Sequence, residues 1–243
     1  MTGVGPLLAL FEGIPRSATA VGVLAGPLIV LGYVSGSVPF AYLLSRRRLR
    51  RQLDDRSLSA LGRGDRGREH HDVRAHVGAG ILAAAATMAA TTLAWQVTLA
   101  ATPGANTFSA VAVFSNQAIG AWVSVALWTG MAAVLGHIAP AWTGFRGGDG
   151  LAPALALTTA YTPLVLLMAA AVFLVVRAVT GRPVTALLGA LAAMVVFAYL
   201  AWLADLQAGW GVTNGPEVTL WISALAVTLF ARHLRSASLP ASG

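Results

Sequence analysis

The sequence predicts an all-α integral membrane protein with about seven transmembrane helices, two of them short. Of its 243 residues, 57% are hydrophobic and only 10% are charged, and the mean hydropathy is +0.73. A soluble domain carries about 25% charged residues, so this chain has too little polar material to cover a surface that faces water. Its apolar runs approach the roughly 20 residues that a helix needs to cross a bilayer, and arginines gather between them. Lipid is therefore the expected solvent for most of the chain.

The first three predicted spans follow an N-terminal segment, residues 1–20, that we expect to be extracytoplasmic or interfacial. This segment lacks the basic start and the small-residue cleavage site of a signal peptide. The first apolar run covers residues 21–44 and is followed at once by five arginines. The second run covers 77–101 and the third 108–135. Each is long enough for one crossing.

The remaining spans begin with a 26-residue run, 151–176, that contains Tyr161-Thr-Pro163 near its middle. Its pattern fits either one kinked, tilted helix or two short helices joined at that turn. The next run covers 184–203, and the last covers 218–231 and ends at Arg232. The transmembrane domain is thus predicted over 21–235, with a disordered tail at 236–243.

The positions of the arginines decide between one helix and two in this middle run. Arginine and lysine accumulate in the cytoplasmic loops of membrane proteins. Counting the run as two crossings gives seven spans, an outer N-terminus and an inner C-terminus, with 15 of 16 arginines on the cytoplasmic side. A single crossing would move Arg177, Arg182, Arg232 and Arg235 outside. The sequence therefore predicts two short helices, with a turn rather than a kink at Tyr161-Thr-Pro163.

A polar loop, residues 45–76, carries ten arginines, five acidic residues and three histidines. A solvated cytoplasmic loop that binds anionic lipid headgroups explains this composition, because each basic residue near an anionic leaflet contributes about 1 kcal/mol. The alternative is a loop that folds over a phosphorylated substrate. Metal binding by His70, His71 and His76 is disfavoured, since adjacent histidines on a helix point apart and the spacing matches no familiar ligand pattern.

A glycine-rich segment follows the third span, beginning with Gly136-His137 and ending with Gly147-Gly-Asp-Gly150. Glycines permit positive φ angles and can present N–H groups to an anion, particularly where a helix begins, as predicted at Leu151. The alternative is a tight interhelical turn with His137 as a helix cap. A histidine, an arginine and clustered glycines at one cytoplasmic end suit a phosphate monoester or an acyl phosphate.

A Gly-Ser-Val-Pro sequence, residues 36–39, lies inside the first predicted span. Proline frees a backbone carbonyl in a transmembrane helix, and a neighbouring Ser or Gly commonly accommodates the break. This segment is therefore either a helix kink or a place where the Ser37 hydroxyl lines a buried polar site.

These motifs, over residues 32–235, resemble those of the bacterial acyl-phosphate:glycerol-3-phosphate acyltransferases. The similar segments are residues 36–44 and the Gly-His-x-x-Pro and Phe-x-Gly-Gly-Asp-Gly sequences within 136–150, with weaker similarity at 182–185 and 232–233. The resemblance implies a seven-helix bundle with cytoplasmic loops, in a bacterial cell membrane. It implies transfer of an acyl group from acyl phosphate to glycerol 3-phosphate, which forms lysophosphatidic acid.

The resemblance also implies the roles of individual residues and the partners. Membrane lipids, acyl phosphate and glycerol 3-phosphate are the expected partners, with no cofactor, no metal and no nucleic acid. Ser37 and His137 correspond to catalytic positions. The implied substrate-binding residues are Arg56, Gly147, Gly148, Asp149, Gly150, Arg182, Arg232 and His233.

Two departures from the family pattern leave two functions open. The Gly-Ser-Gly-Asn loop expected after Arg56 is absent, and Asp149 stands where the family has lysine in a chain that contains no lysine at all. The first function is an acyltransferase of reduced or altered activity. The alternative is a catalytically degenerate paralogue that acts as a membrane scaffold or lipid-binding protein. A transporter is disfavoured, because only Asp205 places an acid near a span end outside the loops.

Overall fold

The computed structural model describes residues 18–40, 43, 73–101, 121–145, 147–204 and 216–238. These residues form seven α-helices and one short 3-10 turn, which confirms the predicted all-helical class. In chain order they are α2 (Ala18–Gly36), α4 (Val73–Ala101), α6 (Ala121–Ile138), η4 (Ala141–Thr143), α7 (Leu151–Tyr161), α8 (Pro163–Thr180), α9 (Pro183–Leu203) and α10 (Pro216–Ser238).

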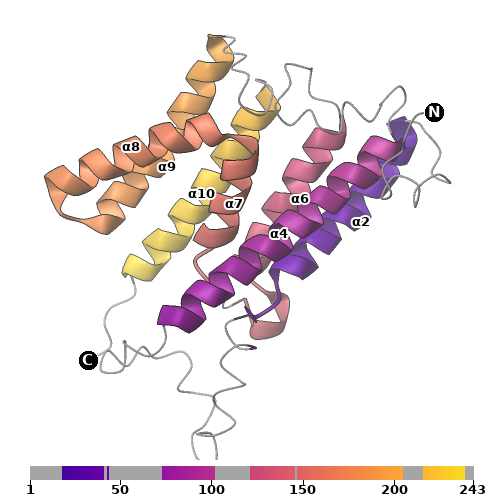
Figure 1. Ribbon diagram of the computed structural model, residues 1–243, viewed down its shortest axis with the longest axis horizontal. Helices are drawn as coiled ribbons and strands as arrows, with labels where there is room; N and C mark the ends of the chain where they lie inside the picture. Colours follow the sequence, from indigo (N-terminus) through magenta and orange to yellow (C-terminus); the bar gives the residue numbers. More distant parts are fainter. Residues whose placement is uncertain are drawn as a thin grey trace, which may run out of the picture.

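The helices form a bundle with a hairpin on one side (Figure 1). Helices α2, α4 and α6 pack against one another, and α7 packs against α4 and α6. Helix α10 contacts α6 and α9, so it joins the bundle to the α8–α9 hairpin. Helix α8 lies at a steep angle to the helices of the bundle in Figure 1, and it packs mainly against α9 and also contacts α7.

Glycines bring α2 and α6 into close backbone contact. A Cβ at Gly32 would collide with the Thr129 carbonyl oxygen, and one at Gly36 would collide with the Ala133 carbonyl oxygen. On the facing helix, a Cβ at Gly136 would collide with the Tyr33 carbonyl oxygen. Small residues spaced four apart are the usual means by which membrane helices approach this closely. This contact places the end of α2 directly beside the end of α6.

Aromatic side chains fill the centre of the bundle. Trp221 of α10 is fully buried and donates its indole N–H to the Leu127 carbonyl oxygen of α6 at 2.9 Å. Tyr161, at the end of α7, lies between two tryptophans, with ring centroids 5.9 Å from Trp95 and 6.4 Å from Trp221. Helices α4, α6, α7 and α10 therefore meet at this cluster, which lies at the end of α7, just before α8 begins.

The predicted break in the middle run is confirmed, because α7 ends at Tyr161 and α8 begins at Pro163. Proline disfavours the α conformation in the residue before it and has no N–H to continue the helix. Thr162 accordingly adopts φ −140° and ψ 55°, outside the helical region. The carbonyl oxygen of Thr162 then accepts the first N–H of the new helix, from Leu166 at 3.0 Å.

Two predicted boundaries were wrong near the Arg-rich loop. Helix α2 ends at Gly36, so the Ser37 segment lies beyond the helix end and not inside a continuous span to residue 44. Pro39 explains this end, since it disfavours helix at the preceding residue. Helix α4 begins at Val73, within the predicted loop 45–76. Most of that loop, including Arg56, lies outside the described residues, as does the segment 102–120 before α6.

The last helix is longer than predicted. Helix α10 extends to Ser238, so Arg232 and His233 lie on it and do not terminate it. Arginine is a good helix former, and cations near a helix C-terminus interact favourably with its dipole. The helix therefore includes the first three residues of the segment that we expected to be a tail.

Five helices are long and apolar enough to cross a membrane. These spans are Val77–Ala101, Val123–Thr143, Pro163–Thr180, Pro183–Leu203 and Pro216–Leu234, while Ala20–Gly36 and Leu151–Tyr161 are apolar but shorter. Large apolar side chains such as Val179, Leu174 and Val30 are more than 60% exposed on the outer faces. Such faces suit lipid and not water. The count of seven crossings stays a prediction.

Candidate active site at one end of the bundle

The candidate residues gather where α2 and α6 end, α7 begins and the last turns of α10 pass, at the lower end of Figure 1. Ser37 follows α2, His137 lies in the last turn of α6, and Arg232 is on α10. The connection from α6 to α7 runs among them and contains η4 and the glycines. Segments almost 200 residues apart in sequence thus meet in one place.

Gly147 and Gly148 form a strap between α6 and α10. Their N–H groups donate to the Ile138 and His137 carbonyl oxygens at 3.1 and 2.9 Å. Their own carbonyl oxygens accept from Arg232, Gly148 from Nε and Gly147 from Nη2, both at 3.1 Å. All four backbone groups are therefore satisfied inside the protein.

The strap requires glycine at both positions because α6 lies so close. A Cβ at Gly147 would collide with the His137 carbonyl oxygen, and one at Gly148 would collide with the His137 ring at Nε2. The imidazole thus lies directly over the Gly148 backbone. Gly150 adopts φ 78° at the N-cap of α7, a left-handed conformation that glycine reaches without strain. Phe145 reaches φ 61° without that advantage, so the backbone is strained there.

Asp149 caps the start of α7 with its side chain. Its Oδ1 accepts the Leu151 N–H at 3.1 Å, while the Ala154 N–H bonds to the Gly150 carbonyl oxygen. The third residue of the helix is Pro153, which has no N–H. A helix N-terminus binds anions through its free N–H groups. Of the first three residues of α7, only Ala152 therefore has a backbone N–H that is available to an anion.

These hydrogen bonds leave few N–H groups of residues 147–151 available to bind a phosphate. From the sequence, we expected the backbone N–H groups of Gly147–Gly150 to bind an anion. In the structure, the N–H groups of Gly147 and Gly148 donate to carbonyl oxygens of α6 instead. The Leu151 N–H donates to the Asp149 side chain. Asp149 itself is exposed and carries a negative charge. Within this site, a phosphate could bind to the remaining N–H groups of the segment and to the N–H groups of Arg232 that the strap does not use.

Ser37 is buried at the same end of the bundle, with 1% of its surface exposed. Its hydroxyl donates to the Tyr33 carbonyl oxygen at 2.6 Å, one turn back in α2. It also lies 2.7 Å from the position that a Cβ on Gly136 would occupy. Ser37 therefore packs against the residue before His137, while its hydroxyl serves the end of its own helix. Its role as a residue that lines a polar site stays a prediction.

Two aromatic residues that the sequence hypotheses did not single out join these segments. The Tyr33 hydroxyl donates to the Ala139 carbonyl oxygen at 2.7 Å, and the Trp142 indole N–H donates to the Ser37 carbonyl oxygen at 2.7 Å. The sequence could have pointed to them by position alone. Tyr33 lies one turn before the Gly-Ser-Val-Pro sequence, and Trp142 lies two residues after Pro140.

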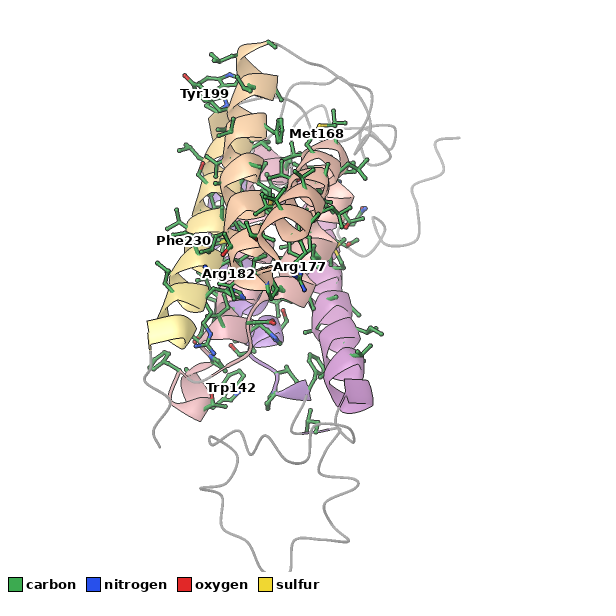
Figure 2. The ribbon with its side chains drawn as sticks, turned by 90° about the vertical axis from the view of Figure 1, so that its left-hand side faces the viewer. Trp142, Met168, Arg177, Arg182, Tyr199 and Phe230 are labelled. Carbon is green, nitrogen blue, oxygen red and sulfur yellow. The ribbon has the colours of Figure 1, made fainter. Side chains whose placement is uncertain are left out.

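The other candidates are placed less favourably. Arg182 lies in the α8–α9 turn, where its hydrogen bonds run through the backbone, from its N–H to Thr180 Oγ1 and from the Ala186 N–H to its carbonyl oxygen. Figure 2 shows Arg182 next to Arg177 at a level well above Trp142, so the structure does not bring it to the glycine strap. His233 Nδ1 pairs with the Leu229 carbonyl oxygen at 2.8 Å within α10. Among the residues described, no three His, Asp or Glu side chains could hold a metal ion.

The sequence of this chain is similar to those of known proteins. The chain matches the glycerol-3-phosphate acyltransferase family over residues 27–238. It is 37% identical over 123 residues to the glycerol-3-phosphate acyltransferase of Granulibacter bethesdensis, which covers 47% of this chain and 54% of that one. Against the enzyme of the same name from Allorhizobium ampelinum it is 27% identical over 215 residues, covering 84% and 83%. A glycerol-3-phosphate acyltransferase of Dehalococcoides mccartyi is 33% identical. This chain spans about half the length of the Granulibacter bethesdensis and Dehalococcoides mccartyi proteins.

Solved structures show the same fold. A crystal structure of PlsY (YgiH), an integral membrane glycerol 3-phosphate acyltransferase, in its lysophosphatidic acid form aligns with a TM-score of 0.58 and 20% identity, covering 88% of this chain and 89% of that one. Its glycerol 3-phosphate form aligns with the same TM-score.

The fold, the apolar helices and the loop at one end define a multi-pass integral membrane protein. The chain belongs to the glycerol-3-phosphate acyltransferase family, because the match extends over most of its length.

Proposed function

We propose that this protein is a membrane acyltransferase of glycerophospholipid synthesis that transfers an acyl group from acyl phosphate to glycerol 3-phosphate, at a reduced rate. The observation that carries the proposal is the convergence of Ser37, His137, the glycine strap and Arg232 at one end of an apolar bundle. An acyl phosphate has a lipid tail and a charged head, so its transfer requires this combination of lipid contact and polar loop.

The reaction is direct transfer between two bound substrates. A hydroxyl oxygen of glycerol 3-phosphate attacks the acyl carbonyl carbon, the bond from that carbon to the phosphate oxygen breaks, and inorganic phosphate leaves while the hydroxyl loses its proton. Holding two phosphorylated molecules in register contributes most of the acceleration, together with charge stabilisation by Arg232. Among the described residues, neither ring nitrogen of His137 has a hydrogen-bond partner, so the unprotonated nitrogen of the neutral ring can accept that proton.

The reduced rate follows from Asp149. Its carboxylate occupies the N–H of Leu151 at the start of α7 and repels a phosphate that approaches the strap. Arg182, another candidate for phosphate binding, lies in a different turn.

We further propose that the N-terminus faces outward and the C-terminus faces the cytoplasm. The support is that seven crossings place 15 of 16 arginines on the cytoplasmic side. The candidate site then faces the compartment where soluble glycerol 3-phosphate is available.

A specific observation also favours the second candidate, a degenerate paralogue that acts as a scaffold or binds lipid. Both N–H groups of the glycine strap and two donors of Arg232 are used inside the protein. Such a loop is stable without a ligand.

Purified protein in detergent or lipid distinguishes the two candidates. We expect slow consumption of acyl phosphate that depends on glycerol 3-phosphate and is lost in His137→Ala. A paralogue without catalysis would consume none with any acceptor offered, although it would still bind lipid.

A further inference from the structure

Two hydrogen bonds connect the ends of α2 and α6 in a reciprocal way. The last carbonyl groups of an α-helix have no N–H group within the helix to accept from. Ser37 directly follows the last residue of α2, and Ala139 directly follows that of α6. Trp142 donates to the first of these carbonyls and Tyr33 to the second, each at 2.7 Å. Each segment thus supplies the side chain that satisfies the end of the other.

Packing alone does not hold the Trp142 side of this connection. Trp142 is 53% exposed, and no residue of η4 is buried. It lies at the lower end of the protein in Figure 2, away from the bundle core. The hydrogen bond from its indole is therefore the main constraint between η4 and Ser37.

The glycine contact does not replace this constraint. Gly36 and Gly136 set how closely α2 and α6 approach through van der Waals packing, but none of the atoms nearest to either glycine belongs to η4. Hydrogen bonds are directional and weaken steeply when the angle or distance changes. A pair of them at opposite ends of a short segment fixes the register of Ser37 relative to His137.

We propose that Tyr33 and Trp142 are positioning residues that hold Ser37 in register with His137 and the glycine strap. The proposal rests on the proposed function for its kinetic consequence, since acyl transfer requires the reacting groups to be placed within a fraction of an ångström and a misplacement of about 1 Å can cost about 100-fold in rate. Its structural consequence is independent of activity.

The structural consequence is tested by labelling a cysteine at position 37. The chain contains no cysteine, so Ser37→Cys gives a single thiol at a site that is 1% exposed. We expect slow reaction with a water-soluble maleimide, and at least tenfold faster reaction when Trp142→Phe or Tyr33→Phe is added. Each change keeps a ring and removes only the donor group.

Matched controls use the same substitutions elsewhere. Trp128 is 40% exposed and Tyr199 is 47% exposed, and within the described part of the chain neither has a hydrogen bond from its polar atom. Trp128→Phe and Tyr199→Phe should leave labelling unchanged. Equal labelling in the Trp142→Phe and Trp128→Phe backgrounds would overturn the proposal.

The kinetic consequence is tested without the cysteine, by the split between kcat and KM for acyl phosphate. We expect Trp142→Phe and Tyr33→Phe each to lower kcat about tenfold with little change in KM. The double variant should be no slower than the slower single variant, because the two bonds act as a unit. Unchanged kcat in both would overturn the proposal even if labelling rises. Absence of turnover in the unmodified protein would overturn the proposed function instead, and labelling would still decide the positions of these residues.

Discussion

The charge of Asp149 gives the sharpest prediction about substrate binding. Asp149→Asn keeps an Oδ1 atom that can accept the Leu151 N–H, so the start of α7 stays capped while the negative charge is removed. Two unit charges about 5 Å apart repel by roughly 3 kcal/mol at an effective dielectric of 20 and by under about 1 kcal/mol in water. Asp149 is exposed, so we take a value of about 1.4 kcal/mol, between these limits, which corresponds to a tenfold change in affinity.

The assay is equilibrium binding of glycerol 3-phosphate to purified protein in detergent. We expect Asp149→Asn to bind about tenfold more tightly than the unmodified protein, and the difference to shrink in 1 M salt because the screening length falls to about 3 Å. Glu217→Gln is the matched control. It also removes one negative charge, but Glu217 lies 15 residues before Arg232 on α10, about 22 Å along the helix.

Equal affinity of Asp149→Asn and the unmodified protein for glycerol 3-phosphate would refute this reasoning. An equal increase in affinity in Glu217→Gln would refute it as well. Robust turnover of glycerol 3-phosphate by the unmodified protein would also refute it, because the repulsion would then have no functional effect. We expect Asp149→Lys to restore turnover only poorly, since the Gly-Ser-Gly-Asn loop of the family is also absent from this chain.

The remaining predictions concern packing, the strap and topology. Gly36→Ala should lower the free energy of unfolding by about 1–3 kcal/mol, measured by denaturation in detergent, whereas Gly22→Ala, with open space around it, should not. Arg232→Lys cannot make both bonds to the strap and should lower turnover about tenfold, while the equivalent change at Arg177 should not; equal effects would contradict the role of the strap. A cysteine at position 213 should react with an impermeant reagent from outside the cell, and reaction from the cytoplasmic side alone would contradict seven crossings.

The sequence predicts the fold well because its signals are strong and local. Apolar runs and arginine positions define most helices, and the predicted break within the run 151–176 is present. Pro163 gives a physical reason for the break. Helix ends were predicted less well, since α10 continues through Arg232 and α2 stops at Gly36.

The candidate site was only partly predictable, for a physical reason. Composition and motifs indicate which residues gather, and Ser37, the glycines and Arg232 do so. They do not reveal which hydrogen bonds each residue makes. That the N–H groups of Gly147 and Gly148 bond to α6 depends on contacts between segments that only the folded chain brings together. The bonds of Tyr33 and Trp142 are of the same kind.

Formation of lysophosphatidic acid by the purified protein would show directly that it is a glycerol-3-phosphate acyltransferase. The protein would be supplied with acyl phosphate and glycerol 3-phosphate in lipid, and product and released phosphate would be measured together. We predict slow, equimolar formation of both, lost in His137→Ala and strongly reduced in Arg232→Ala. No product above the rate without protein, with the protein shown to be folded, would contradict the assignment of acyltransferase activity.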